Sequence, residues 1–252
     1  MTGFGDPVLD RSKPAVPGNR EPTARSLQTR SFASYFRGTK PDLEKLRTGL
    51  APLPNTAREL RAVANALDVP TSEIKLGPEA TEPVVKSLPL RNYRIVYFAT
   101  HGLVSGEING LAEPALVLTL PERPNEEDDG LLTASEVAEL KLNADWVVLS
   151  ACNTAAGDTP GAEGLSGLAR AFFYAGARAL LVSHWSLEDE AATAITTGTF
   201  TRLSKDPLLG RAEALRQATL AFLDNSANPT DAFPAIWAPF VIVGEGGAVT
   251  SR

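Results

Sequence analysis

The stretch RIVYFATHG, residues 94–102, decides the fold of this chain. Its apolar run is rich in β-branched and aromatic residues, which predicts a buried strand over residues 94–100. The strand ends at His101, one of two histidines in the sequence, and Gly102 follows. A histidine at this place is either a loop side chain facing water or a catalytic base held at the edge of a sheet.

Two further apolar runs end in reactive side chains in the same way. The run Trp146–Ser150 is expected to be a strand covered on both faces, and Ala151 and Cys152 follow it. The run Ala179–Ser183 is a third strand, followed by His184 and Trp185. Shorter strands are predicted at residues 73–76, 115–120 and 239–243.

Helical patterns separate these strands. Asn55 is a good N-cap for a helix over residues 56–68, and Thr133 with Glu136 has the spacing of a capping box. Apolar periodicity predicts further helices at residues 82–88, 164–176, 188–204 and 209–224. Alternating strands and helices predict an α/β fold with a mostly parallel sheet and helices on both faces.

Composition excludes several classes of function. The net charge of −6 argues against broad nucleic-acid binding. The sequence contains no stretch of 18 consecutive apolar residues, so no transmembrane helix is expected. The start of the chain does not resemble a secretory signal, and the single cysteine suits a reducing, cytoplasmic location. One cysteine and two separated histidines give no zinc-ligand spacing, and no phosphate-binding glycine motif is present. We therefore expect no metal, no cofactor, and neither nucleic acid nor membrane as a partner.

The strand ends suggest nucleophilic catalysis. Open α/β sheets carry their working residues just past the carboxyl ends of strands. If the strands before His101 and Cys152 are neighbours, the two side chains come within reach, and the imidazole can lower the pKa of the thiol or accept its proton. The backbone N–H groups of Gly102 and Cys152 would then be oxyanion-hole donors. The alternative is that Cys152 is a small buried apolar residue.

Three ordered blocks resemble the CHAT domain family of caspase-like cysteine peptidases, which are related to separase and are often fused to TPR repeats. The blocks are YFATHG, DDGLLTASEVAELKLNADWVVLSACNT and GAEGLSGLARAFFYAGARALLVSHWSLEDEAA. The resemblance implies a caspase-like fold, His101 as base and Cys152 as nucleophile. It also implies hydrolysis of a protein or peptide substrate through a thioester, and a TPR-containing or regulatory protein as a further partner.

The resemblance also implies a division of the chain. Residues 53–247 would form the peptidase domain. Residues 1–52 are rich in Pro, Arg and Ser and show little periodicity, which independently predicts a loop-rich N-terminal segment with a short helix near residues 30–36. Because GFGDPVLD at residues 3–10 resembles the tail of an earlier strand, this segment would be the remainder of a truncated upstream part of the domain.

The substrate pocket is expected near Asp158, Glu163, His184, Trp185 and Asp189. Trp185 would form a wall, and His184 either lines the pocket or is a loop residue beside Trp185. Glu188 and Asp189 are expected to cap the next helix and complement its dipole. In the alternative, Asp189 or Asp158 lies in the pocket and favours a basic substrate side chain.

Other interpretations stay open at this point. The acidic run at residues 122–129 predicts a solvated surface or, alternatively, a regulatory cleavage loop. The whole domain could be a catalytically silent interaction or assembly module that keeps the caspase-like fold. A flavodoxin-like ligand-binding domain fits the strand rhythm but lacks a phosphate or flavin motif.

Overall fold

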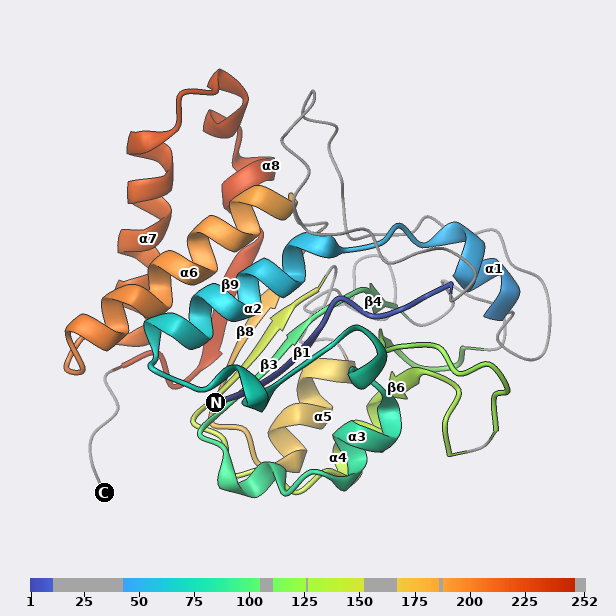
Figure 1. Ribbon diagram of the computed structural model, residues 1–252. Helices are drawn as coiled ribbons and strands as arrows, with labels where there is room; N and C mark the ends of the chain where they lie inside the picture. The colour runs from blue at the N-terminus through green and yellow to red at the C-terminus, as the bar shows by residue number, and fades with distance from the viewer. Residues whose placement is uncertain (11–42, 105–110, 126, 152–166, 186–187, 248–252) are drawn as a thin grey trace.

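A mostly parallel sheet forms the centre of the computed structural model (Figure 1), which describes residues 1–10, 43–104, 111–125, 127–151, 167–185 and 188–247. Within these residues the sheet has six strands in the order β2-β1-β3-β7-β8-β9. Their bounds are β1 Thr2–Gly5, β2 Ile74–Leu76, β3 Ile95–Ala99, β7 Trp146–Ser150, β8 Ala179–Ser183 and β9 Phe240–Gly244. All neighbours pair in parallel except β9, which is antiparallel to β8.

Helices cover both faces of this sheet (Figure 1). One face carries α2 (Pro54–Ala66) and α6 (Asp189–Lys205), with α7 (Arg211–Asn225) packed against α6. The other face carries α3 (Glu82–Ser87), α4 (Ala134–Glu139) and α5 (Gly167–Ala175). The predicted α/β class, with helices on both faces of a mostly parallel sheet, is confirmed.

The alternation of side chains along β3 explains the two layers. Tyr97 and Ala99 pack with Leu60 of α2 in the core on one face. Val96 and Phe98 point to the opposite core, where the ring of Phe98 lies 5.6 Å from that of Phe172. Successive residues of a strand face opposite sides of the sheet, so this fully apolar strand is buried on both faces.

Helix starts follow the capping signals with one exception. Thr133 and Glu136 form the predicted capping box, and the Glu188 side chain accepts a hydrogen bond from Ala191 N at 2.7 Å as the N-cap of α6. The prediction of Asn55 as an N-cap is wrong: α2 begins at Pro54 with Leu53 as its N-cap. Proline suits the first helical turn because the N–H it lacks would have no partner there.

A second, small antiparallel sheet lies beside the carboxyl end of β3. It joins β4 (Gly102–Leu103), β5 (Ala115–Val117) and β6 (Leu131–Thr133), and its core includes α1 (Leu43–Gly49). The strand predicted over residues 115–120 is therefore shorter than expected. Leu118 N still donates to Gly130 O in the register of β5 and β6, and the chain leaves the ladder after it, where Thr119 and Leu120 donate to Ala80 and Val8.

Short elements complete the described chain: the 3₁₀ turns η1 (Thr71–Glu73), η2 (Gly77–Glu79), η3 (Leu90–Asn92) and η4 (Pro229–Ala232), and helix α8 (Pro234–Trp237). The helix predicted near residues 30–36 lies outside the described residues. The division of the chain at residue 52 stays a prediction, while β1 places residues 2–5 inside the large sheet, between β2 and β3. Within the described residues, no helix has the length and apolarity needed to cross a bilayer.

Candidate active site

The two strands that precede His101 and Cys152 are direct neighbours. Strand β3 pairs in parallel with β7, and Ala99 lies opposite Ser150. His101 comes two residues after Ala99, and Cys152 comes two residues after Ser150. The neighbour relation that the sequence argument required is therefore present. Cys152 itself, with Asp158 and Glu163, lies outside the described residues.

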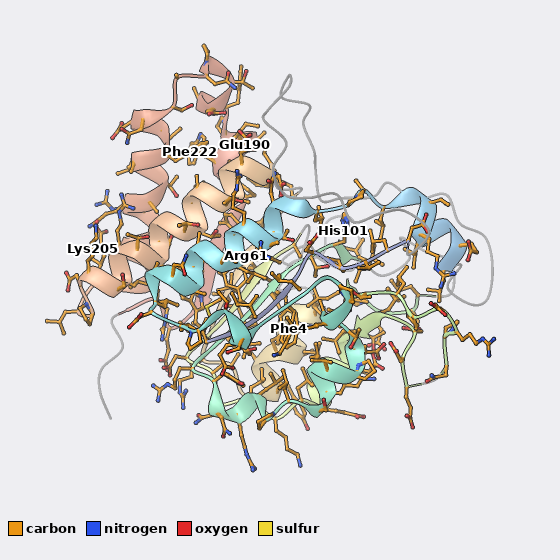
Figure 2. All side chains as sticks on the ribbon, in the orientation of Figure 1. Phe4, Arg61, His101, Glu190, Lys205 and Phe222 are labelled. Carbon is orange, nitrogen blue, oxygen red and sulfur yellow. The ribbon has the colours of Figure 1, made fainter. Side chains whose placement is uncertain are left out.

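His101 is held inside the protein at this edge of the sheet (Figure 2). Its side chain is buried, and Nε2 lies 2.8 Å from the carbonyl oxygen of Ala51. A carbonyl only accepts hydrogen bonds, so Nε2 carries the proton and donates it to Ala51. The backbone oxygen of His101 accepts a hydrogen bond from Val117 N at 2.9 Å. His101 is therefore fixed through both its ring and its backbone, which excludes the water-facing interpretation.

The backbone N–H of Gly102 points away from the small sheet. Strand β4 pairs with β5 so that Gly102 lies opposite Leu116, next to the hydrogen-bonded pair of His101 and Val117. Opposite residues in an antiparallel ladder alternate between bonded and non-bonded pairs. Gly102 and Leu116 form a non-bonded pair, so the ladder with β5 does not use this N–H.

The end of β7 is tied to its other neighbour. Ser183, the last residue of β8, donates its hydroxyl to the carbonyl oxygen of Ala151. Both residues are fully buried. The backbone is thus anchored at the residue that directly precedes Cys152.

The described members of the predicted pocket lie after β8 and at the start of α6. His184 is exposed and its backbone N donates to Pro239 O at 3.0 Å. Trp185 is 38% exposed, donates Nε1 to Ala235 O at 3.0 Å and stacks on His184 with ring centroids 6.4 Å apart. Asp189 is buried in the first turn of α6, directly after the capping residue Glu188.

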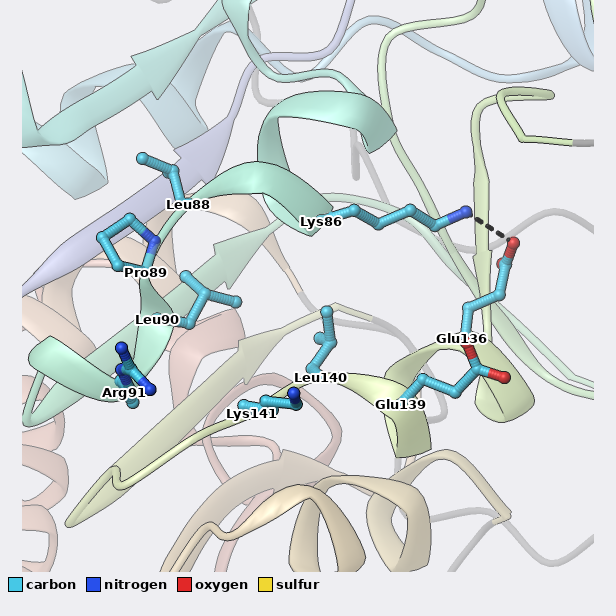
Figure 3. A pocket seen from close by; sticks show the side chains of 9 residues that line it. All are labelled: Lys86, Leu88, Pro89, Leu90, Arg91, Glu136, Glu139, Leu140 and Lys141. Atoms are coloured by element: carbon cyan, nitrogen blue, oxygen red, sulfur yellow. Dashed lines mark hydrogen bonds and ion pairs between the residues drawn. The ribbon is translucent and has the colours of Figure 1, made fainter.

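A cavity of about 400 Å³ lies elsewhere, between η3 and α4 (Figure 3). Leu88, Leu90 and Leu140 contribute apolar surface, and Lys86 and Glu136 form an ion pair in its wall at 2.8 Å. His101 and Gly102 do not line it. Among the described residues no group of three His, Cys, Asp or Glu side chains is arranged to hold a metal.

Sequence reasoning missed Ala51 as the partner of the histidine ring. The two residues are 50 positions apart, and the contact uses a backbone carbonyl rather than a recognisable side chain. The only local signal is the pair of prolines at positions 52 and 54, which predicts a stiff turn before a helix.

Comparison with solved structures gives the Arg-specific cysteine proteinase gingipain R, with a TM-score of 0.48 and 11% identity over 85% of this chain and 45% of that one. A complex of the Porphyromonas gingivalis RgpB pro- and mature domains has a TM-score of 0.46 and 10% identity, over 85% and 46% of the two chains.

Sequence comparisons give tetratricopeptide repeat protein 28 of mouse, 28% identical over 227 residues, and its human counterpart, 27% identical over 226 residues. Each alignment covers 77% of this chain but only 9% of the mouse protein and 8% of the human protein. The chain thus spans less than a tenth of the length of these curated relatives. A family model described as the CHAT domain matches residues 5–245. With nearly its whole length matched, the chain belongs to the CHAT domain family.

Proposed function

We propose that this domain is a cysteine endopeptidase with His101 as its base and Cys152 as its nucleophile. The observation that carries the proposal is the register of β3 and β7, which pairs Ala99 with Ser150 at the carboxyl ends of the two strands. His101 and Cys152 each follow two residues after this pair. A buried imidazole at that edge, already oriented by a hydrogen bond, is what a thiol nucleophile needs. Membership of the CHAT family supports the same assignment.

The contact with Ala51 supports Nδ1 as the ring nitrogen that acts in this proposal. Nε2–H donates to the Ala51 carbonyl, so in the neutral imidazole Nδ1 carries the lone pair. Nδ1 is then the atom that accepts the thiol proton. The carbonyl takes the place of the third group in a catalytic triad, because it orients the ring and stabilises the imidazolium that forms.

The proposed reaction has two halves. The thiolate attacks the carbonyl carbon of the scissile peptide bond, and the N–H groups of Gly102 and Cys152 stabilise the oxyanion. The imidazolium returns its proton to the leaving amine, which leaves a thioester on Cys152. His101 then removes a proton from water, and the resulting attack on the thioester releases the acid and restores the thiol.

The proposal also covers the substrate pocket, the partner and the location of the protein. Trp185, with its partly exposed ring next to His184, is the proposed wall of the pocket, and Asp158, Glu163 and Asp189 are its proposed acidic members.

A TPR-containing protein is the proposed partner, since the curated relatives are named for TPR repeats. The single cysteine favours the cytoplasm as the proposed location.

The proposal is tested on the thiol itself. Cys152 is the only cysteine, so iodoacetamide alkylation followed by intact mass reports one site. We expect the alkylation rate to titrate well below the free-thiol pKa of about 8.5, and His101→Ala to move it back toward that value. A peptide cleaved by the wild type should be left intact by Cys152→Ala, and His101→Ala should cleave it about 100-fold or more slowly.

Two outcomes contradict the peptidase proposal. One is a thiol that titrates near 8.5 both in the wild type and in His101→Ala. The other is cleavage of the peptide that persists in Cys152→Ala. The first outcome favours the alternative function, an interaction module without catalysis. Urea denaturation of each variant checks that the fold is retained.

A further inference from the structure

The carbonyl that orients His101 belongs to a loop residue that needs its own support. Ala51 lies in the connection between α1 and α2, and its side chain is exposed to solvent. Its carbonyl nevertheless reaches Nε2 of a buried ring at 2.8 Å. Two residues further on, Leu53 is buried, so the turn enters the protein directly before α2 begins.

Thr56 connects this turn to the end of β1. Its hydroxyl donates to the carbonyl oxygen of Leu53 at 2.7 Å and accepts a hydrogen bond from the backbone N–H of Asp6 at 2.8 Å. Its backbone N also donates to Leu53 O, at 3.0 Å. The side chain is fully buried and uses its donor and an acceptor position at once.

The strand that Thr56 contacts is the one that flanks the histidine strand. Gly5 of β1 pairs with Ala99 of β3, two residues before His101. A Cβ atom at Gly5 would lie 2.6 Å from Leu60 Cδ1 and 3.4 Å from Thr56 Oγ1. Glycine at this position therefore lets α2 approach closely enough for the hydroxyl to reach Asp6.

We infer that Thr56 is a positioning residue, which fixes the turn at residues 51–53 and through it the hydrogen bond from His101 to Ala51. The two bonds of its hydroxyl join three segments: the end of β1, the turn before α2, and α2 itself. The inference on catalysis rests on the proposed function, whereas the inference on the ring does not. Thr56→Val keeps the shape of the side chain and removes both hydroxyl bonds, and Thr56→Ser keeps both.

The state of the imidazole gives the direct test. The chain has two histidines, so ¹⁵N NMR of the ring nitrogens shows two spin systems, and His101→Ala assigns them. We expect His101 of the wild type and of Thr56→Ser to be in the Nε2–H form with a slowly exchanging proton. In Thr56→Val this proton should exchange at least tenfold faster, and both tautomers should be populated.

The matched control is Thr2→Val. Thr2 of β1 is also fully buried, and its hydroxyl donates to Glu73 O at the end of the strand opposite to Gly5. It should leave the His101 signals as in the wild type. If Thr56→Val does not fold, Thr56→Ala replaces it. An unchanged His101 tautomer and exchange rate in the folded Thr56 variant would overturn the inference.

Kinetics separate this inference from the peptidase proposal. If Cys152 is the nucleophile, Thr56→Val should lower kcat about tenfold to 100-fold with little change in KM, and Thr56→Ser should restore it. A Cys152→Ala variant that loses no activity refutes the peptidase but leaves the NMR result for Thr56 standing. A kcat in Thr56→Val equal to that of the wild type, in an active enzyme, would overturn the positioning role.

Discussion

At the scale of single residues, Asp6 carries an unusual backbone and an unusual carboxyl group. Its φ is +51°, a left-handed value that aspartate and asparagine tolerate better than most residues. Its backbone N–H donates to Thr56, and its half-buried carboxyl has a pKa raised from 3.8 to about 6. Burial is the cause, and the charge of Arg61 opposes it only in part.

Because the pKa of Asp6 is raised in the folded protein, the contribution of this carboxyl group to stability falls as the pH rises. Between about pH 4 and pH 6 the folded protein holds a proton on Asp6 that the unfolded chain has lost, so raising the pH favours unfolding. Asp6→Asn keeps the tolerance for positive φ and removes the titration. After allowance for solvent screening of a half-buried group, we expect the wild type to lose about 1 kcal/mol more than this variant between pH 4 and pH 7. Urea denaturation at the two pH values measures the difference.

A second aspartate provides the control for this experiment. Asp68 also has a positive φ, +53°, but its side chain is exposed. Asp68→Asn should leave the pH dependence of the unfolding free energy as in the wild type. If Asp6→Asn behaves like Asp68→Asn, the carboxyl of Asp6 does not carry the effect.

At the scale of elements, β1 shows how four residues serve two layers. Phe4 faces the core on one side, where its ring stacks on Phe98 at 5.2 Å. Gly3 and Gly5 face the other side, and a Cβ atom at either would lie within 2.7 Å of a methyl group of Leu60. The strand thus provides an aromatic side chain for one layer and bare backbone for α2 on the other.

Gly5→Ala should therefore push α2 away from the sheet. The added Cβ also lies 3.1 Å from the carbonyl oxygen of Ala99, and backbone cannot move as a side chain can. We expect a loss of about 1–3 kcal/mol in the free energy of unfolding, the usual cost of overpacking. Gly247→Ala is the control, because a Cβ there meets nothing within 4 Å. Equal stability of the two variants in urea would contradict this account of the packing.

At the scale of the whole molecule, the sequence predicted what depends on long apolar runs. Strands β7 and β8 have the predicted bounds, and the placement of His101 at a strand end follows from β3. The small sheet was not predicted as a unit, because strands of two or three residues are too short to show a period. The pairing of β3 with β7 was only a condition in the sequence argument, since strand order depends on contacts that no local pattern records.

An ion cluster around Lys86 connects α3, which covers the large sheet, to α4 and to the loop that leads into β6 of the small sheet. Its ammonium donates to Glu82 at 2.6 Å, to Glu136 at 2.8 Å and to the backbone oxygen of Glu127 at 3.1 Å. The side chain of Glu82 is 1% exposed, and its other oxygen accepts the backbone N–H groups of Asp129 and Gly130, each at 3.0 Å. Burial raises the pKa of Glu82 to about 7, and the hydrogen bond from Lys86 opposes that rise.

Lys86→Met should loosen the small sheet while leaving the large one intact. Without the ammonium, the buried Glu82 carboxylate loses its cationic partner and keeps, among the described residues, the backbone donors of Asp129 and Gly130. We expect a loss of about 2–3 kcal/mol in the free energy of unfolding near pH 8. The loss should shrink near pH 5.5, where Glu82 is protonated, because its pKa lies above that pH. Hydrogen exchange should accelerate in β6, which directly follows the residues Asp129 and Gly130 held by Glu82, and in its neighbour β5, but not in β3 and β7. The control is Lys141→Met. Lys141 is an exposed lysine that lines, together with Lys86, the cavity between η3 and α4 (Figure 3). If the two variants match in exchange and stability, the Lys86 cluster does not stabilise the small sheet.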